Sequence, residues 1–394
     1  MLKQTIGLIP RFNWDMRLPD LIEVLRAPFR RTEDPGRIFR EVLGGIPVFT
    51  GSGRTALYLI LKALNLPKGS KVGVPLFCCP VVFDSVRRAG LIPRFLDVDL
   101  KDYTISAADL KRKQHDIAAV VVVHMFGHPA DMDAIIPACA GLPVIEDCAH
   151  SLFSRYKGRT TGFLGNAAFF TFRSGKYVSA GEGGAVIARD PDLLIRIENL
   201  VQGFEAPGLA GEILHGLSTY IKSSLYRRPW YGTVGRPIGG LLDRTLNLSA
   251  KTGFEFRKIR AGNLALINGR LPTFLQRIQK QRENSLALLG RLQIKDASLP
   301  TERAGCWSNY YQFAVRLDRQ ERRDRLAAHL LRRGVDAALY LDEIVEESRR
   351  DYGYDGDCPN SEYAAKRTLV LPNHYTLSDR DLDWIIRAVN ESGI

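Results

Sequence analysis

The stretch that decides the fold runs from Gly141 to Asp190 and reads GLPVIEDCAHSLFSRYKGRTTGFLGNAAFFTFRSGKYVSAGEGGAVIARD. Its first apolar run, LPVIED, predicts a buried strand that ends in an acid, Asp147. The runs NAAFFTF and GGAVIARD predict two more strands, and the loop between them contains Lys176. An acid and a lysine therefore follow neighbouring strands, at the sheet edge where ligands of α/β proteins bind.

Strands and helices alternate regularly upstream of this stretch. Strand patterns at 47–50, 71–77, 91–99, 117–124 and 142–147 alternate with helix patterns at 51–64, 81–89, 107–112 and 131–140. This order predicts an α/β fold with a mostly parallel sheet and helices on both faces. We assign residues 1–250 to this large domain. Residues 251–394 read as a smaller C-terminal α+β domain, with a long helical stretch at 253–292, strands at 310–318 and 368–372, and helices at 320–333 and 378–391.

The charge of the chain favours anionic partners. The 394 residues carry a formal net charge of +12, and residues 208–260 contain nine Lys or Arg against three Asp or Glu. This basic, aromatic insert, at about 204–250, has two interpretations. It is either a solvated loop and helix packed on the body, or an interfacial patch that contacts anionic headgroups or a lipid-linked diphosphate. In the second interpretation the patch consists of Tyr226, Trp230 and Tyr231 beside Arg227, Arg228 and Arg236.

Other bulk features exclude several classes of function. The basic residues do not lie on a recognisable DNA-reading helix, so we expect no nucleic-acid partner. The six cysteines lack paired metal spacing, which indicates free thiols in a reducing cytoplasm and no metal site. The N-terminus has no long apolar segment of the signal-peptide kind, and no apolar run has the length of a membrane span.

The pair Asp147 and Lys176 matches the needs of a pyridoxal phosphate (PLP) site. The lysine would form a Schiff base with the cofactor aldehyde, and the acid would keep the pyridine nitrogen protonated. The alternatives are a solvated surface lysine and an acid paired with an arginine or a helix end. A lysine shielded between two apolar strands would have a lowered pKa, which favours the first interpretation.

Further polar residues follow strand ends in the same region. The turn Gly51–Thr55 could hold a phosphate on backbone N–H groups at a helix start, or could simply be a tight turn. The Thr171 hydroxyl could bind the same phosphate. His150 could donate to the phenolic oxygen of the cofactor, or could pack as a core histidine.

The order of short motifs resembles the DegT-type family of PLP-dependent sugar aminotransferases. From Gly51 to Asp190 it reads G-S-G-x-x-A-L, V-P-x-F, D-V-D, V-H-x-x-G-x-P-x-D-M, E-D-x-A-H, G-x-x-x-G-x-L-G, T-F-x-x-x-K and G-E-G-G. The resemblance implies a fold-type I enzyme, usually a homodimer with its active sites near the subunit interface. It implies catalytic roles for Lys176 and Asp147. It also implies cofactor contacts at the matching positions Ser52, Gly53, Arg54, Cys79, Asp147, His150, Thr171 and Lys176.

Three positions depart from the family pattern. Arg54 replaces the threonine of the family's S-G-T turn, and Cys79 aligns with the aromatic residue that stacks on the cofactor ring, a role that Phe77 or Phe83 could take instead. The family's N-Y-R motif, which reaches toward the partner subunit's phosphate, aligns with Glu255-Phe256-Arg257. A glutamate cannot donate a hydrogen bond to phosphate, so that cross-subunit contact is in question.

The resemblance implies transfer of an amino group from an amino-acid donor, often glutamate, to a keto-sugar that is nucleotide- or lipid-diphosphate-linked. We expect a cytoplasmic enzyme, peripheral at the membrane if the insert binds lipid, in polysaccharide, glycolipid or secondary-metabolite biosynthesis. One alternative is another PLP reaction such as deoxysugar dehydration, although family members that dehydrate commonly replace the lysine by histidine. The other is a non-catalytic binding or regulatory role, which only the departures at Arg54, Cys79 and Glu255 support.

Overall fold

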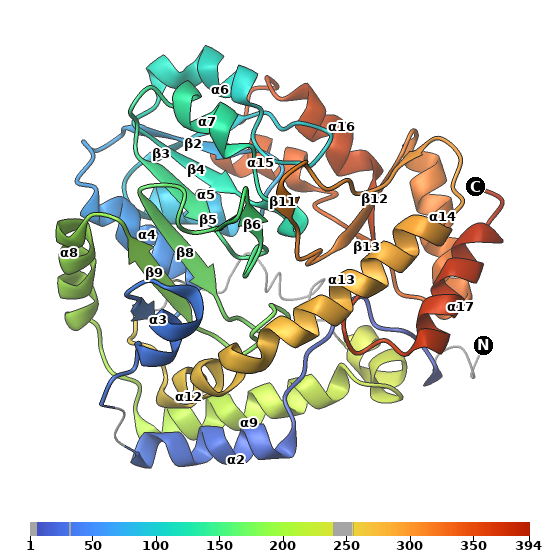
Figure 1. Ribbon diagram of the computed structural model, residues 1–394, viewed down its shortest axis with the longest axis horizontal. Coiled ribbons are helices and arrows are strands. Elements are labelled where there is room, and N and C mark those ends of the chain that lie inside the picture. The colour runs from blue at the N-terminus through green and yellow to red at the C-terminus, as the bar shows by residue number, and fades with distance from the viewer. Residues whose placement is uncertain (1–5, 31–32, 239–253, 255) are drawn as a thin grey trace.

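A seven-stranded sheet forms the centre of the computed structural model, which describes residues 6–30, 33–238, 254 and 256–394 (Figure 1). Its order is β1-β9-β8-β5-β4-β2-β3, and only β9 runs against its neighbours. The carboxyl ends of β1, β5 and β8 therefore meet at one edge, and the predicted mostly parallel sheet is confirmed. The strands are β1 (Val48–Thr50), β2 (Lys71–Pro75), β3 (Ile92–Leu96), β4 (Ala119–Val123), β5 (Val144–Asp147), β8 (Ala167–Thr171) and β9 (Gly184–Ala188).

Helices cover both faces of this sheet, as the alternation predicts. The central strand β4 is buried along its whole length because alternate valines pack in opposite directions. Val121 and Val123 face a cluster with α4 (Gly53–Ala63), α5 (Val81–Arg88) and α8 (Pro191–Gln202). Val120 and Val122 face α6 (Ala107–Lys113) and α7 (Met132–Ala138). On this second face, β8 and β9 pack against α2 (Leu18–Arg26), α3 (Arg37–Leu43) and α12 (Ala261–Arg270).

The C-terminal part contains an antiparallel sheet of order β10-β12-β14-β13. Its strands are β10 (Ala297–Ser298), β12 (Phe313–Leu317), β13 (Ala338–Leu339) and β14 (Thr368–Leu371). A cluster of its own joins this sheet to α13 (Phe274–Arg291), α14 (Gln320–Arg332) and α17 (Asp379–Asn390). Two helices that were not predicted, α15 (Ile344–Tyr352) and α16 (Pro359–Arg367), pack against the cluster of the main sheet.

A small third sheet connects the two parts. The loop that follows β5 contains a hairpin of β6 (Arg155–Tyr156) and β7 (Arg159–Thr160). The short strand β11 (Cys306–Trp307) pairs with β6, so the C-terminal part is tied directly to the loop that follows β5. This tie brings residues near 309–311 close to the carboxyl edge of the main sheet.

The helical stretch predicted at 253–292 differs in its start. The helix begins only at Ala261, and the turn η5 (Leu271–Thr273) separates α12 from α13 next to Pro272. Gly262, in the first turn of α12, allows α2 to approach, because a Cβ there would lie 2.7 Å from Val24 Cγ1. The predicted domain boundary between residues 250 and 251 lies outside the described residues and stays a prediction.

The insert contains a helix that was not predicted in detail, α9 (Leu209–Leu225), followed by the short turn η4 (Tyr231–Gly235). The aromatic patch expected here does not form as a single exposed surface. Tyr231 is buried and donates its hydroxyl to Asp336, while Tyr226 lines an internal cavity. Arg228 makes an ion pair across to α17, and only Trp230 of the three aromatic residues is exposed. Tyr231 therefore does not belong to an exposed patch, whereas contact of the insert with lipid stays a prediction, and residues 239–250 lie outside the described part.

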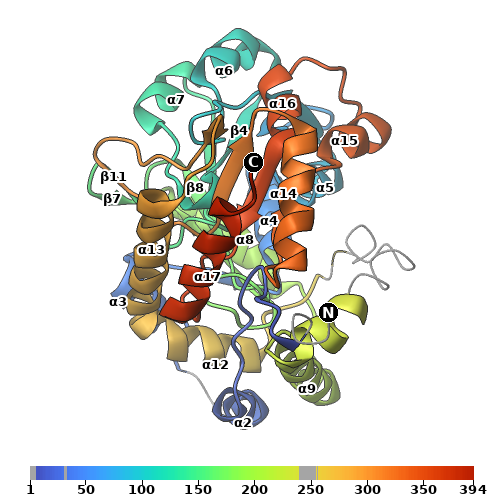
Figure 2. The same cartoon turned by 90° about the vertical axis from the view of Figure 1, so that its right-hand side faces the viewer.

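The N-terminal segment at residues 8–16, here called the N-terminal strap, crosses from the C-terminal part to the main sheet. Ile9 pairs with Val335, and Arg11 binds Asp336 at 2.9 Å. Farther along, the carbonyl of Trp14 accepts a hydrogen bond of 2.8 Å from Ser223 of α9. The strap is thereby held at both ends, and Figures 1 and 2 show α2, which follows it, lying beside α9 at the lower end of the molecule.

Candidate active site

A cavity of about 520 Å³ lies at the carboxyl edge of the main sheet. Seven of the eight predicted cofactor-binding residues line it, because the parallel strands β1, β2, β5 and β8 end at the same edge. They are Ser52, Gly53, Arg54, Cys79, Asp147, Thr171 and Lys176. His150 is the predicted residue that is not among the lining residues. Cavities of this size, with a few converging polar groups, are typical of small-molecule sites.

Asp147 is the last residue of β5. The preceding residue, Glu146, fixes this end of the strand through its hydrogen bonds. The Glu146 carboxylate accepts hydrogen bonds from His124 Nε2 at 2.9 Å and from the backbone N–H groups of Gly162 and Leu164. Although burial raises the pKa of Glu146, the His124 contact and these N–H groups lower the pKa overall, so the acid stays charged. The network fixes the direction of the next side chain, Asp147, toward the cavity.

The Asp147 carboxylate is buried and accepts a hydrogen bond of 2.8 Å from the backbone N–H of Ala149. Burial raises the pKa of Asp147, and the Ala149 bond and the nearby Lys176 charge oppose this effect only in part. A buried carboxylate is stabilised by a cationic N–H partner. Asp147 lining a cavity therefore fits a ligand with a protonated ring nitrogen.

Lys176 lies in the loop between β8 and β9, which is closed by local hydrogen bonds. Ser174 donates from both its backbone N and its hydroxyl to the carbonyl of Gly181, and Gly181 adopts a φ of 93° that favours glycine. Burial, and after it the neighbouring Arg173, lower the pKa of Lys176 to about 8. A lysine with such a pKa is partly neutral near pH 8 and can act as a nucleophile.

The turn from β1 into α4 forms a narrow cradle opposite Thr171. Ser52 caps α4 by accepting the N–H of Thr55 at 3.2 Å. A Cβ on Gly53 would lie 2.7 Å from Thr171 Cβ, so only glycine allows the helix start and the end of β8 to approach this closely. The helix N-terminus and the Thr171 hydroxyl thus face the same end of the cavity, an arrangement that suits a phosphate.

Arg54 follows directly in this cradle, where the family has threonine. Burial lowers the pKa of Arg54, and the charge of Arg173, which lines the same cavity, lowers it further. Its guanidinium also lies 5.9 Å from the centre of the Phe254 ring. Two arginines that repel one another on one cavity fit an anion bound beside them.

His150 sits behind Tyr311, and the two rings stack with centroids 4.4 Å apart. The backbone N–H of Phe126 donates to His150 Nδ1 at 3.3 Å, so the neutral ring carries its proton on Nε2. Burial, followed by the Lys176 charge, lowers the pKa of His150 well below its usual value. Tyr311 lies between the histidine and the lysine, since Lys176 Nζ is 4.9 Å from its ring centre.

The three candidates for stacking on a cofactor ring occupy different places. Cys79 is exposed and lines the cavity, whereas Phe77 and Phe83 are fully buried in the cluster of the main sheet. Stacking by either phenylalanine, which the sequence left open, is therefore wrong. Glu255 lies outside the described residues, and Arg257 lines the cavity of its own chain.

An aromatic wall of three residues, Phe12, Trp14 and Tyr226, was not predicted from the sequence. Phe12 stacks on Tyr226 at 5.4 Å, and Trp14 lies 5.3 Å from the same ring. Two of these side chains come from the N-terminal strap and one from the end of α9. Sequence carries no signal for this contact, because its partners are about 210 residues apart and are held together by hydrogen bonds of Ser223 and Arg227 to the N-terminal strap.

The cavity is also more cationic than the sequence motifs suggested. Besides Lys176 and Arg54 it is lined by Arg173, Arg257 and Arg260, against the two acids Asp147 and Glu182. Arg260 binds Glu182 at 3.1 Å. The excess of positive charge suits a ligand that carries more than one phosphate.

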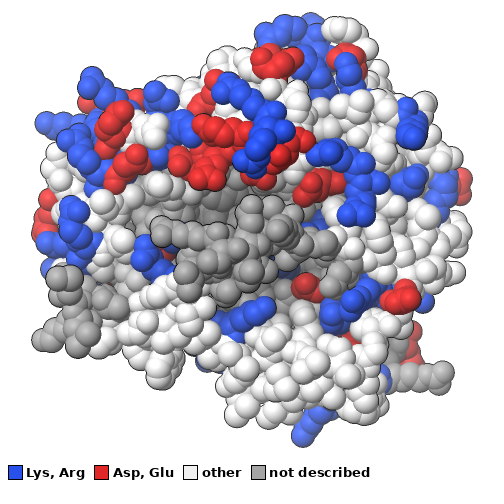
Figure 3. All heavy atoms as spheres, turned by 180° about the vertical axis from the view of Figure 1, so that it is seen from behind, with Lys and Arg blue, Asp and Glu red and all other residues white. Residues whose placement is uncertain are grey.

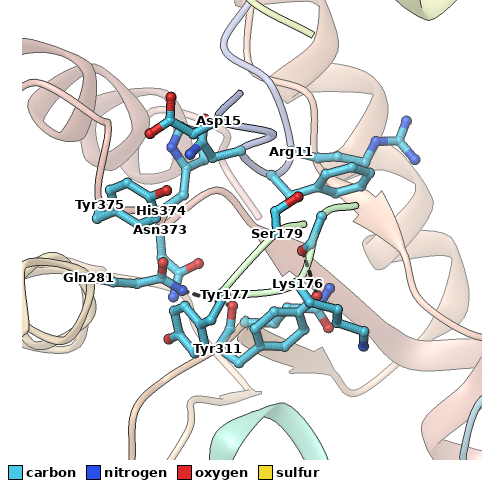
Figure 4. Close-up of a pocket in the computed structure, with 14 residues that line it drawn as sticks. Arg11, Asp15, Lys176, Tyr177, Ser179, Gln281, Tyr311, Asn373, His374 and Tyr375 are labelled. Atoms are coloured by element: carbon cyan, nitrogen blue, oxygen red, sulfur yellow. Dashed lines mark hydrogen bonds between the residues drawn. The ribbon is translucent and has the colours of Figure 1, made fainter. Parts of the chain in front are cut away.

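A second, smaller cavity of about 30 Å³ lies on the other side of Lys176 (Figure 4). It has room for about one water molecule. Figure 4 shows Tyr311 and Lys176 at one side and His374, Asn373 and Tyr375 at the other. Among the described residues, the buried Ser179 hydroxyl on this cavity has no hydrogen-bond partner, which favours a bound water here.

Comparison with known proteins decides the family. A model of the DegT/DnrJ/EryC1/StrS aminotransferase family matches residues 40–390. The chain belongs to this family. It is therefore an aminotransferase of the α/β, fold-type I class, as the motif order implies, and membership implies PLP as cofactor.

Named relatives of this aminotransferase act on sugars or belong to biosynthetic pathways. The chain is 26% identical to a GDP-perosamine synthase of Escherichia coli O157:H7, over 86% of this chain and 84% of that protein. It is 30% identical to the erythromycin biosynthesis sensory transduction protein EryC1 of Saccharopolyspora erythraea, over 86% and 83% of the two chains. The crystal structure of the aminotransferase TlmJ from Streptoalloteichus hindustanus superposes with a TM-score of 0.78 at 25% identity, covering 98% of both chains.

The residues of this aminotransferase fit PLP. The Gly53–Thr171 approach leaves a cradle that a Cβ would fill, Asp147 offers a buried carboxylate, and Lys176 offers an amine of lowered pKa on the same cavity. None of the helices in the described ranges combines the length and the apolar character that a bilayer crossing requires.

Proposed function

We propose that the chain binds PLP in the large cavity and transfers an amino group from glutamate to a diphosphate-linked keto-sugar. The single observation that carries the proposal is the placement of Lys176 and Asp147 on one cavity with an anion cradle at its end. The family supports the reaction type. The choice of donor and sugar is our inference.

Each polar residue of the cavity has a defined part in this proposal. Ser52, Gly53, Arg54 and Thr171 would hold the cofactor phosphate, and the Asp147 carboxylate would hold the proton on the ring nitrogen. Cys79 would lie against the ring, and His150 would act through Tyr311 or by a small ring movement toward the phenolic oxygen. The bound cofactor supplies an aldehyde that exchanges amines and a protonated ring that accepts electrons.

Lys176 Nζ would first hold the cofactor covalently and then, once displaced by the donor's amine, act as the base. With a pKa of about 8, roughly a tenth of this amine is neutral at pH 7, far more than for an ordinary lysine. The neutral Nζ would take a proton from the donor's α-carbon and deliver it to the cofactor carbon that keeps the amino group. Tyr311, 4.9 Å from Nζ by its ring centre, limits where the amine can move and shields it from water.

The remaining features of the cavity support a sugar carried on a diphosphate. Arg173, Arg257 and Arg260 provide positive charge beyond the cofactor phosphate cradle. The aromatic wall of Phe12, Trp14 and Tyr226 offers a surface for a sugar ring or a base. Relatives named for GDP- and dTDP-sugars favour a nucleotide carrier, and a lipid diphosphate would present the same charge.

The test follows the visible absorbance of the bound cofactor. Purified protein loaded with PLP should show this band, and Lys176→Ala should abolish it while the surface variant Lys62→Ala keeps it. Glutamate, glutamine and aspartate are then added in turn. We expect glutamate to bleach the band with release of 2-oxoglutarate. Retention of the band in Lys176→Ala, or bleaching without any keto acid, contradicts the proposal.

We also propose a homodimer, because this family resemblance implies active sites near a subunit interface. Light scattering during size-exclusion chromatography measures the mass directly. A monomer that still transfers amine at full rate would contradict this assignment.

A further inference from the structure

Helix α9 of the insert is turned with its apolar side outward. The residues that it buries are Glu212, Gly216, Thr219 and Ser223, which are polar or small and recur at helical spacing. On the opposite side, Leu214 is 67% exposed and Ile221 is 57% exposed. A surface helix of a globular protein normally shows the reverse pattern.

Specific contacts fix this rotation of the helix. Glu212 accepts the N–H of Ala261 at 2.8 Å, at the start of α12. At the other end, Ser223 accepts the N–H of Met16 at 2.9 Å. Gly216 allows α2 to approach, since a Cβ there would lie 2.7 Å from Val24. A rotation of the helix that buried its leucines would break these hydrogen bonds. The contacts of Glu212 and Ser223 therefore keep the apolar side of α9 facing outward.

A second apolar stripe lies beside it on α2 and the following turn η1 (Ala27–Phe29). Leu18, Ile22 and Phe29 recur at helical spacing and are exposed, Phe29 by 71%. Met16 contacts Ser223 while Val24 contacts Gly216, so α2 and α9 run antiparallel and in contact. Figures 1 and 2 place both helices together at the lower end of the molecule. We call the outward side of these two helices the α2–α9 face.

The charge around the α2–α9 face is positive. Arg17, Arg227 and Arg277 converge on the single buried carboxylate of Asp15, at 3.3, 3.8 and 3.2 Å, which leaves two positive charges in excess (three less one). Lys222 is exposed on α9 itself, and the one acid of the helix, Glu212, is buried. Figure 3 shows the lower end of the molecule with few charged side chains, whereas the upper edge carries a dense mixture of both signs.

We propose that the α2–α9 face docks the enzyme on the surface of an anionic lipid bilayer. Apolar side chains flanked by Lys and Arg are the pattern of helices that lie in the membrane interface without crossing it. An anionic leaflet supplies the opposite charge, whereas a symmetric contact between two copies brings the same cations together. The docking proposal does not depend on the amino-transfer reaction.

Docking in this way places the aromatic wall close to the headgroups. Tyr226, which lines the large cavity, follows Ile221 by five residues, about 7.5 Å along the helix axis. A substrate held at the bilayer surface would therefore meet the cavity without leaving the interface.

The test is co-sedimentation of the full-length protein with vesicles. Phosphatidylcholine vesicles with phosphatidylglycerol should bind the protein, phosphatidylcholine alone should bind it less, and added salt should release it. The triple variant Phe29→Gln, Leu214→Gln, Ile221→Gln should lower the partition coefficient at least roughly tenfold, because each side chain loses apolar area buried in lipid. Lys222→Gln should lower it about fivefold.

A matched control changes three exposed apolar residues elsewhere, Ile136→Gln, Ile195→Gln and Leu339→Gln. This control should bind vesicles as the unchanged protein does. Circular dichroism and amino transfer with a soluble substrate check that both triple variants are folded. If the unchanged protein binds vesicles but transfers no amino group, the proposed reaction is contradicted and the docking proposal is not. Absence of vesicle binding overturns the proposal. A triple variant that lowers the oligomer mass while vesicle binding is unchanged also overturns it, and assigns the face to contact between copies.

Discussion

Replacing Lys176 by methionine should stabilise the cofactor-free protein at neutral pH. Burial and the nearby Arg173 lower the pKa of Lys176 from 10.5 to about 8, and this difference corresponds to about 3 kcal/mol of unfavourable free energy for the charged form. Below pH 8 the folded and the unfolded protein both carry the proton, so the whole penalty applies. Methionine fills the same space without the charge, and Lys176→Met should therefore raise the free energy of unfolding at pH 7 by up to about 3 kcal/mol.

The sign of the pH dependence follows from proton binding. Between about pH 8 and 10.5 the unfolded chain holds a proton on this amine that the folded chain has released. The stability of the unchanged protein therefore rises with pH in this window, and the advantage of Lys176→Met shrinks toward zero. All other titrating groups are common to both proteins and cancel in the difference.

Urea denaturation of both cofactor-free proteins between pH 7 and 10.5, followed by circular dichroism, measures this difference directly. Lys62→Met, at an exposed position of α4, is the control and should change stability by less than about 0.5 kcal/mol at every pH. A Lys176→Met variant that is no more stable at pH 7, or whose advantage stays constant up to pH 10.5, would refute the reasoning. The rate of cofactor uptake should in turn rise with pH around 8, because only the neutral amine reacts.

Four further predictions concern the same cavity. Asp147→Asn should stabilise the cofactor-free protein at pH 7, and this advantage should disappear as the pH falls and Asp147 takes up its proton, which denaturation at several pH values measures. The same substitution should slow amino transfer by roughly 100-fold or more, which rate measurements check. Arg54→Thr should weaken retention of PLP by about 1.5–3 kcal/mol, measured by equilibrium dialysis, and unchanged retention would show that this arginine faces elsewhere. Gly53→Ala, whose Cβ would lie 2.7 Å from Thr171 Cβ, should cost about 1–3 kcal/mol of stability and loosen the phosphate. Trp14→Phe keeps the aromatic wall but removes a buried indole N–H without a described partner, and should raise KM for the sugar while cofactor loading stays unchanged.

Local sequence was sufficient where function depends on strand ends. Asp147 ends β5, and Thr171 ends β8, five residues before Lys176, so a parallel sheet necessarily brings them to one edge. The turn at Ser52 and Gly53 was recognisable for the same reason, because β1 delivers it to that edge as well. Apolar periodicity could not say which of Cys79, Phe77 and Phe83 reaches the cavity, since all three follow one strand and only packing separates them.

Long-range contacts account for what the sequence left undetermined. The insert was recognisable by composition, and its charge and aromatic content suggested an exposed patch that included Tyr231. In the structure Tyr231 is buried and donates a hydrogen bond to Asp336. The helix of the insert is held by Glu212 and Ser223, whose partners lie 49 and 207 residues away. Helical periodicity does not reveal that a polar side will face inward, because burial of a polar residue depends on a distant hydrogen-bond partner.

The sequence by itself determined the α/β fold, the family and the acid–lysine pair, since each depends on the order of residues along neighbouring strands. Tertiary structure alone decided the aromatic wall, the arginines around the cavity and the outward apolar side of α9. In the first case the chain positions the groups through regular geometry. The features of the second group depend on segments, such as the N-terminal strap and α9, that meet only after folding. Neither segment's own sequence indicates which distant segment it will contact.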